Sequence, residues 1–118
     1  GAASAVAKCL PELKGKLTGN AIRVPTPNVS LAVMSLFLER EVTKEELNEY
    51  LLKASLEGDL QNQIDFVNST EAASTDFVGN RYAGIVDAQA TLAQGAHIVL
   101  YVWYDNEFGY SSQVVRVL

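Results

Sequence analysis

The residues of this chain that could do chemistry are few and lie towards its two ends. Arg23 stands in the apolar run AIRV, directly before the Pro25-Thr26-Pro27 triplet. A guanidinium is costly on a half-buried strand unless it meets an anion, and its planar fork matches a phosphate or a carboxylate. Two interpretations of Arg23 therefore stay open: an exposed arginine on a sheet face, or a clamp for an oxyanion.

A second candidate for anion binding is the chain start at Gly1. The apolar helix expected there has no capping residue before it in this sequence. Its first amides then lack acceptors, and free N–H groups at a helix N-terminus bind anions. Either a preceding residue or an anion would satisfy these amides. Gly1 and Arg23 together could form one phosphate site.

The stretch YVWYDNEFGYS, residues 101–111, carries a third set of polar groups where an apolar strand ends. Asp105 and Glu107 could simply cap the following turn. Asn106 offers both a donor and an acceptor, which a carboxamide such as nicotinamide requires for a pair of hydrogen bonds. Tyr110 could close an apolar wall beside it. Loops at the ends of strands commonly face ligands, which favours a binding role for this turn.

The single cysteine and the single histidine are weak candidates for catalysis. Cys9 precedes Leu10 and Pro11 and has no histidine nearby in sequence, so we interpret it as an inert, buried helix residue. His97 opens an apolar strand without a visible nucleophile partner, and we expect local hydrogen bonds to satisfy it. Motifs for dinucleotides, phosphate loops, hydrolases and zinc proteases are missing. We therefore expect neither a catalytic residue nor a metal site in this chain.

Composition and charge exclude several function classes. The 118 residues are 48% hydrophobic and 19% charged, which is typical of one soluble globular domain. The net charge of -5, with only 9 Lys and Arg, argues against nucleic acid as a partner. A single cysteine favours a reducing compartment, so a cytoplasmic location is expected. No leader and no apolar stretch of about 18 residues is visible, which argues against a membrane.

Hydrophobic periodicity predicts a helix-and-sheet chain. A first helix is expected over residues 2–13, and two strand segments over residues 21–24 and 29–38 are separated by a break at the prolines. The most secure element is a helix that begins after Thr43 and stops at Gly58, because Thr43 and Glu46 form a capping box. Leu47, Tyr50, Leu51 and Ala54 fall on one face of that helix.

The second half of the chain predicts a mainly antiparallel sheet. The β-rich runs IDFV (64–67), STDFV (74–78), YAGIVDA (82–88) and HIVLYVWY (97–104) are separated by Asn, Gly and Ser, as short strands usually are. Ser111 or Ser112 could cap a last helix, which the chain end interrupts after about two turns.

Two stretches carry a resemblance to a known family. GAASAVAKCLPELKGKLTGNAIRVPTPNVS at the start and WYDNEFGYS near the end resemble the catalytic domain of phosphorylating glyceraldehyde-3-phosphate dehydrogenase. The resemblance covers nearly the whole chain and is weakest in the middle. It implies an α+β fold with a mixed, largely antiparallel sheet and helices packed on one face. It also implies a homotetramer that uses NAD, glyceraldehyde-3-phosphate and inorganic phosphate.

The resemblance also implies roles for four residues. Arg23 matches the arginine that holds phosphate, and Gly1 matches a glycine whose amide helps to bind an anion. Asn106 matches the asparagine that orients the nicotinamide carboxamide, with Tyr110 packed nearby. Gly1 and Arg23 are thus expected to bind substrate, and Asn106 and Tyr110 to bind cofactor.

The resemblance implies, finally, that residues 1–118 are a partial catalytic domain. The family's cysteine nucleophile, its base histidine and its NAD-binding Rossmann domain would precede this sequence, and neither Cys9 nor His97 matches a catalytic residue. The isolated chain is therefore expected to be inactive. Two alternatives remain open: a fragment of an erythrose-4-phosphate dehydrogenase, and a non-catalytic remnant that oligomerises through its sheet.

Overall fold

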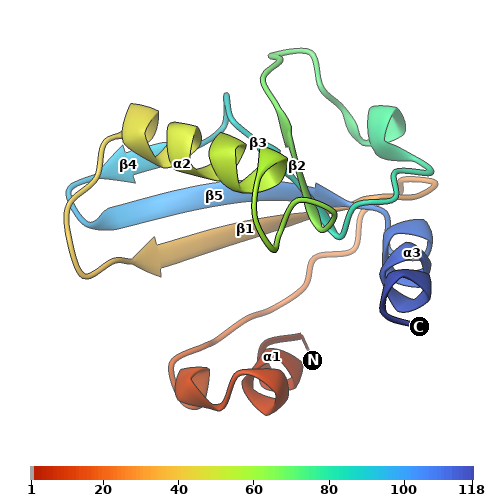
Figure 1. The fold of residues 1–118 in the computed structure, drawn as a ribbon, viewed down its shortest axis with the longest axis horizontal. Coiled ribbons are helices and arrows are strands. Elements are labelled where there is room, and N and C mark those ends of the chain that lie inside the picture. The colour runs from red at the N-terminus through yellow and green to blue at the C-terminus, as the bar shows by residue number, and fades with distance from the viewer. Residues whose placement is uncertain (1) are drawn as a thin grey trace.

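The computed structural model describes residues 2–118, and Gly1 lies outside the described residues. The fold is α+β: a mixed five-stranded sheet carries helices along one face and at one end (Figure 1). The elements follow one another as α1 (Ala2–Cys9), η1 (Pro11–Leu13), β1 (Ser30–Phe37), α2 (Lys44–Leu56), β2 (Ile64–Val67), η2 (Ser74–Phe77), β3 (Gly84–Asp87), β4 (Leu92–Gln94), β5 (His97–Tyr104) and α3 (Phe108–Val117). The expected fold class is confirmed.

The long strand β5 is the centre of the sheet, whose order is β1-β5-β3-β2. On one side it pairs antiparallel with the whole of β1, from Ser30 opposite Tyr104 to Phe37 opposite His97. On its other side it pairs with β3 near Trp103 and with β4 near Ile98, both antiparallel. Strands β2 and β3 run parallel to each other. The end of β5 and the start of β1 are thereby fixed side by side.

Helix α2 begins and ends as its sequence predicts. The Thr43 hydroxyl accepts from the Glu46 amide, and the Glu46 carboxylate accepts from the Thr43 amide, each at 3.1 Å. Gly58, just beyond the helix, has a φ of +78°, a conformation that glycine adopts without strain. Leu47, Leu51 and Ala54 are half-buried, whereas Tyr50 is 70% exposed and takes no part in the core.

The two faces of the sheet differ in how well they are covered. Along β5, the buried Ile98 and Leu100 alternate with half-buried neighbours, the pattern that a helix on one face produces. We call the other side the open face, and its exposed apolar side chains are Leu31, Val33, Phe37 and Leu92. The end of the open face nearest α3 is closed by η2, where Phe77 stacks on Trp103 at 5.4 Å.

Four expectations about the elements were wrong. Residues 21–24 form no strand; they are exposed and extended, and Ile22 is 85% exposed. Residues 74–77 form the 3-10 helix η2, because the Asp76 carboxylate accepts from the Ala73 amide at 2.8 Å and closes a turn. The short strand β4 was not foreseen. The first helix ends at Cys9, where Pro11 starts the separate turn η1, and Cys9 is exposed rather than buried.

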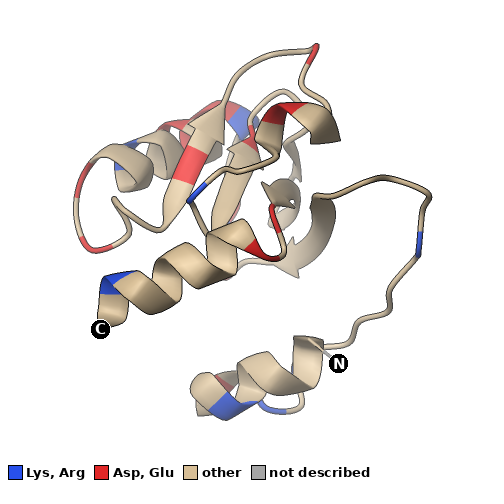
Figure 2. Ribbon diagram, turned by 90° about the vertical axis from the view of Figure 1, so that its right-hand side faces the viewer, with Lys and Arg blue, Asp and Glu red and all other residues tan. Residues whose placement is uncertain are grey.

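The N-terminal unit of α1 and η1 lies apart from the sheet, to which residues 14–29 connect it (Figures 1 and 2). The two short helices pack against each other, and the chain returns past α1 at Gly19, close to Ala3. No helix among residues 2–118 is long and apolar enough to cross a membrane.

Candidate functional site

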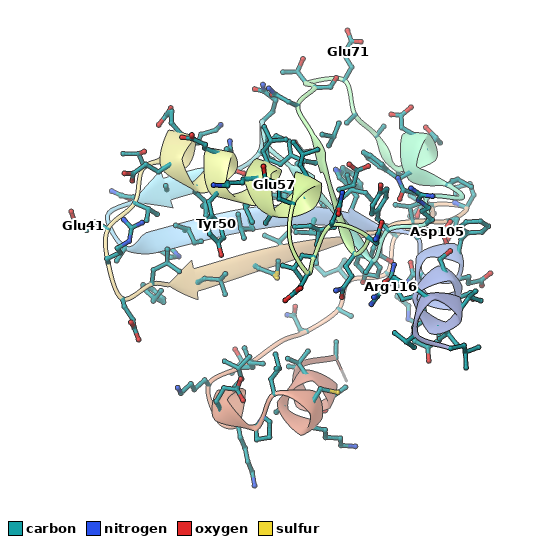
Figure 3. The ribbon with its side chains drawn as sticks, in the orientation of Figure 1. Glu41, Tyr50, Glu57, Glu71, Asp105 and Arg116 are labelled. Atoms are coloured by element: carbon teal, nitrogen blue, oxygen red, sulfur yellow. The ribbon has the colours of Figure 1, made fainter. Side chains whose placement is uncertain are left out.

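The turn between β5 and α3 is organised by the buried carboxylate of Asp105, which is 2% exposed. Figure 3 places Asp105 where β5 gives way to α3. Its Oδ1 accepts from the amides of Glu107 at 3.0 Å and Phe108 at 2.8 Å, so it caps the first turn of α3. Its Oδ2 accepts from the Gly79 amide at 2.9 Å and from Asn28 Nδ2 at 3.0 Å. Four donors thus satisfy one buried carboxylate.

These hydrogen bonds stabilise the charged form of Asp105. The amides of Gly79 and Phe108 contribute most to lowering the pKa of the Asp105 carboxyl below its ordinary value, and burial opposes them. The carboxylate therefore stays ionised at neutral pH. The sequence-based interpretation that Asp105 caps the following turn is confirmed, whereas the Glu107 side chain makes no capping bond. The helix begins at Phe108, earlier than the expected Ser111 or Ser112, because Asp105 provides the cap.

The turn before β1 is joined to the turn after β5. The Asn28 side chain donates to Asp105 and also accepts from the Val29 amide at 2.8 Å. Val29 has a φ of +74°, which is costly for a β-branched residue. Its side chain is 7% exposed and packs in a cluster with Phe77 and Ile85. Burial and the bonds of Asn28 together hold Val29 in this strained conformation.

Asn106 and Tyr110 are both on the surface at this end of the sheet. The Oδ1 atom of Asn106 accepts from the Ser30 hydroxyl at 2.7 Å. Within the part of the chain that the structure describes, its Nδ2 group makes no hydrogen bond and remains available to a ligand. Tyr110, on the first turn of α3, is 71% exposed. These two side chains offer a hydrogen-bond donor and an exposed aromatic ring at this end of the sheet.

Gly109 keeps α3 close to the rest of the site. A Cβ atom at this position would lie 2.6 Å from the Tyr82 carbonyl oxygen. The glycine is buried in the first turn of the helix, so a side chain there would have to displace backbone. Asp105 and Gly109 therefore fix the direction in which the 106–110 turn leaves the sheet.

The predicted phosphate site is only partly described. Arg23 lies in the extended segment 17–27, is exposed, and makes no hydrogen bond or ion pair with any residue of the range 2–118. The expectation that Arg23 lies on a half-buried strand was therefore wrong, and its guanidinium is open to solvent. Gly1 falls outside the described residues, so its convergence with Arg23 stays a prediction.

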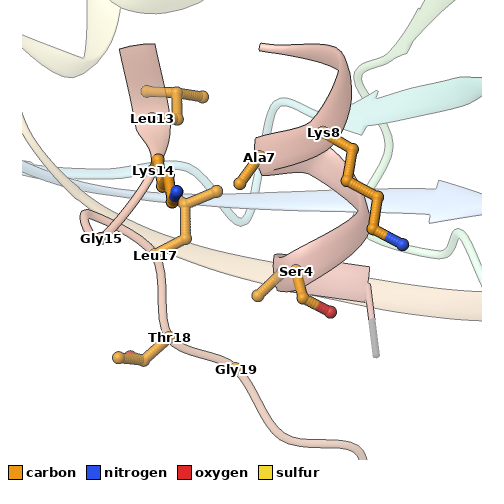
Figure 4. A pocket seen from close by; sticks show the side chains of 10 residues that line it. Ser4, Ala7, Lys8, Leu13, Lys14, Gly15, Leu17, Thr18 and Gly19 are labelled. Atoms are coloured by element: carbon orange, nitrogen blue, oxygen red, sulfur yellow. The ribbon is translucent and has the colours of Figure 1, made fainter. Parts of the chain in front are cut away.

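The first 27 residues are the basic part of an otherwise acidic chain (Figure 2). They hold four Lys and Arg and one Glu, a net charge of +3, while the remaining five basic and thirteen acidic residues give -8. An open pocket between α1 and the segment after η1 is lined in part by Lys8, Lys14 and Thr18 (Figure 4). This charge asymmetry favours an anion near the N-terminal unit.

Cys9 and His97 lie on different elements and in unlike surroundings. Cys9 is on α1, whereas His97 begins β5, where its Nε2 lies 2.7 Å from the Ser35 hydroxyl and its ring stacks on Phe37 at 4.5 Å. The expectation that local contacts satisfy His97 is confirmed. No group of three or more His, Cys, Asp or Glu among residues 2–118 could hold a metal ion.

Sequence reasoning missed the residues that support Asn106. Ser30 and Asn28 lie 76 and 77 positions before their partners Asn106 and Asp105. The only signal was the position of Asn28 directly after Pro27, where an amide side chain often closes a turn. Trp103 has a structural role as well, since its Nε1 donates to Asp87 Oδ2 at 3.1 Å.

Comparisons with known proteins identify the family of the chain. Residues 1–106 match the family model described as glyceraldehyde 3-phosphate dehydrogenase, C-terminal domain. The whole chain is 67% identical to a glyceraldehyde-3-phosphate dehydrogenase-like protein of Pseudomonas aeruginosa (strain UCBPP-PA14) and covers 26% of it. It is 48% identical to glyceraldehyde-3-phosphate dehydrogenase 2 of Mucor circinelloides f. lusitanicus and covers 35% of that protein.

A bacterial enzyme gives the same result: 98% of the chain is 47% identical to glyceraldehyde-3-phosphate dehydrogenase 1 of Bacillus subtilis (strain 168) and covers 34% of it. The chain thus spans about a quarter to a third of the length of these relatives. Its matched residues include Arg23 and the DN pair at 105–106. The chain belongs to the glyceraldehyde-3-phosphate dehydrogenase family, as a part of its C-terminal domain.

Proposed function

We propose that this chain is part of the catalytic domain of a phosphorylating glyceraldehyde-3-phosphate dehydrogenase. The whole protein would oxidise glyceraldehyde-3-phosphate with NAD and capture the acyl group on inorganic phosphate, giving 1,3-bisphosphoglycerate in glycolysis. The observation that carries this proposal is the Asn106 amide, exposed with its Nδ2 group free, on a turn fixed by the buried Asp105. Family membership supports the reaction class.

Asn106 and Tyr110 are proposed to bind the nicotinamide end of NAD. When bound there, NAD would supply the hydride acceptor of the reaction. The Asn106 Nδ2 group would donate to the carboxamide, and the exposed ring of Tyr110 would shield one side of the nicotinamide from water. Neither residue needs to move a proton. Their contribution is to fix the orientation of the acceptor ring, which is a positioning effect.

Arg23 and the amide of Gly1 are proposed to bind phosphate. The Arg23 guanidinium has its five N–H donors open and can form a bidentate contact with a phosphate oxygen pair. The net charge of +3 over residues 1–27 favours the same ligand. Because phosphate must attack an acyl intermediate, a fixed anion site of this kind would orient the acyl acceptor rather than activate it by proton transfer.

The nucleophile, the base histidine and the NAD-binding domain are proposed to come from the rest of the protein. In support, the chain covers only 26% to 35% of the relatives described above. Cys9 and His97 are on separate elements, and His97 already contacts Ser35 and Phe37. The 118-residue chain alone should therefore not form NADH from glyceraldehyde-3-phosphate, and appreciable turnover by this chain would contradict the proposal.

A homotetramer is proposed for the whole protein, with the open face as one contact between subunits. Val33 and Phe37, on this face of β1 with Ser35 between them, are 57% and 82% exposed, and exposed apolar side chains on one sheet face favour an interaction site. Sedimentation of the full-length protein should give a tetramer, and Val33→Arg should reduce its size. The same open face would also suit a non-catalytic remnant that oligomerises, which would show assembly without turnover.

A cytoplasmic location is proposed from the single cysteine and from a relative named as cytosolic. The chain is 46% identical to the cytosolic glyceraldehyde-3-phosphate dehydrogenase of Pinus sylvestris. Fractionation of cells that produce the full-length protein tests this.

Turnover of the full-length protein tests the reaction. NADH formation should require glyceraldehyde-3-phosphate, NAD and inorganic phosphate together, and should be much slower with erythrose-4-phosphate. The relatives described above are named for the first aldehyde, which favours it. A larger kcat/KM for erythrose-4-phosphate would favour that substrate instead, and failure with both aldehydes would contradict the proposed class of enzyme.

A further inference from the structure

The amide of Asn106 is held by a residue from the far end of the sequence. Ser30 is the first residue of β1 and lies opposite Tyr104, the last residue of β5. Its hydroxyl donates to Asn106 Oδ1 at 2.7 Å, two residues beyond this pair. The bond joins the two strands just past the end of their ladder. It therefore restrains the position of the Asn106 side chain, and with Oδ1 bonded to Ser30 the Nδ2 end of the amide faces outward.

We propose that Ser30 is a positioning residue for the cofactor contact of Asn106. With Oδ1 occupied by the Ser30 hydroxyl, the Nδ2 group is the end of the amide that faces the ligand. Asn106 then acts as a hydrogen-bond donor and selects an acceptor, namely a carbonyl oxygen. This inference rests on the proposed contact between Asn106 and the nicotinamide carboxamide.

The strained turn before β1 explains how Ser30 is held in place. Val29 adopts a φ of +74° while its side chain stays in the core, and Asn28 on its other side donates to Asp105. The residues on both sides of Val29 thus bond to the consecutive residues 105 and 106. Backbone strain of this kind persists only where the surrounding structure holds it in place. Here the turn is bonded to the 105–106 segment at two points, through Asn28 and Ser30.

A purely structural role for Ser30 makes different predictions. If its hydroxyl only joined β1 to the turn, losing it would lower stability and affect the aldehyde, phosphate and NAD alike. A positioning role acts through Asn106 alone. The effect of Ser30 on NAD should then disappear when Asn106 is absent, which a double-mutant cycle measures.

The experiment uses the full-length protein and compares KM values for NAD, aldehyde and phosphate. Ser30→Ala should raise the KM for NAD about 5- to 10-fold, as expected for one lost hydrogen bond, and leave the KM for phosphate within about 2-fold. Ser30→Thr keeps the hydroxyl and should stay close to the wild type. Ser35→Ala is the matched control, because this serine lies on the same strand and bonds to His97 at the other end.

The double variant and a cofactor analogue complete the test. In an Asn106→Ala background, Ser30→Ala should cause no further rise in the KM for NAD. The 3-acetylpyridine analogue of NAD keeps the carbonyl oxygen and lacks the amide nitrogen, so Ser30→Ala should raise its KM by the same factor. If Ser30→Ala fails to fold, Ser30→Cys serves, because a thiol of similar size donates only weakly.

Three outcomes would overturn the inference, and the first two are distinguishable by what they leave standing. If Asn106→Ala weakens NAD binding but Ser30→Ala does not, Ser30 is not a positioning residue and the proposed cofactor contact stands. If neither variant changes the KM for NAD, the cofactor contact itself is wrong and the inference fails with it. Equal effects of Ser30→Ala in the presence and absence of Asn106 would also contradict positioning.

Discussion

Asn28 donates to Asp105 across 77 positions of sequence, with 3.0 Å between Nδ2 and Oδ2. This bond connects the turn before β1 to the turn after β5, which carries Asn106. Because the Asp105 carboxylate also caps α3, one buried charge determines the relative positions of three segments.

Low pH should lower the stability of the fold through protonation of Asp105. Its pKa is lowered in the folded state, so its stabilisation is complete above the unfolded value near 3.9 and is lost as the pH falls through the folded pKa. Asp105→Asn should lower stability at neutral pH and flatten its dependence on pH below about 4. Urea unfolding of the 118-residue chain, followed by fluorescence of its single tryptophan, measures this. Glu71→Gln, on the exposed loop before η2, is the control and should keep the wild-type acid dependence (Figure 3).

At position 29, the glycine variant should be more stable than the alanine variant, which reverses their usual order. Both substitutions remove a buried side chain, but only glycine adopts a φ of +74° without strain. Val29→Gly should therefore be more stable than Val29→Ala by about 1 kcal/mol, whereas glycine is ordinarily the less stable of the two. Unfolding midpoints in urea would show the order. If Val29→Ala proves the more stable variant, the turn is not strained.

Gly109 should tolerate no side chain. The Cβ of Gly109→Ala would lie 2.6 Å from the Tyr82 carbonyl oxygen, so α3 must shift and overpacking should cost about 1–3 kcal/mol. Gly19→Ala is the control, because its Cβ would meet only Ala3 at an ordinary 3.6 Å. In the full-length protein, Gly109→Ala should also raise the KM for NAD. Equal stability of the two alanine variants would show that the contact has no energetic effect.

The sequence predicts the elements whose signals are local. The capping box of Thr43 and Glu46 is contained within four residues, and the apolar runs of β1 and β5 are eight residues long. Residues 21–24 have the composition of a strand, but a strand requires a partner, and the described residues supply none. Ser74–Phe77 has β-forming residues, yet a single aspartate side chain turns it into a 3-10 helix.

The candidate site is predictable only in part, because its support is non-local. Asn106 and Tyr110 can be chosen from their chemistry and from the family motif. The bonds that hold them come from Ser30, Asn28 and Gly79, and no sequence spacing indicates these pairs. The backbone strain at Val29 also cannot be predicted from the sequence, because valine is ordinarily a strand residue. Its left-handed conformation depends on packing against Phe77 and Ile85.

The most direct test of the account compares two substitutions in the full-length protein, by their effects on the KM for NAD and the KM for phosphate. Asn106→Ala should raise the KM for NAD about 10-fold and leave that for phosphate unchanged. Arg23→Ala should raise the KM for phosphate at least 10-fold and leave that for NAD unchanged, because bonds to a charged group are stronger. If Asn106→Ala leaves the KM for NAD at the wild-type value, the turn after β5 does not bind the cofactor and the account is contradicted.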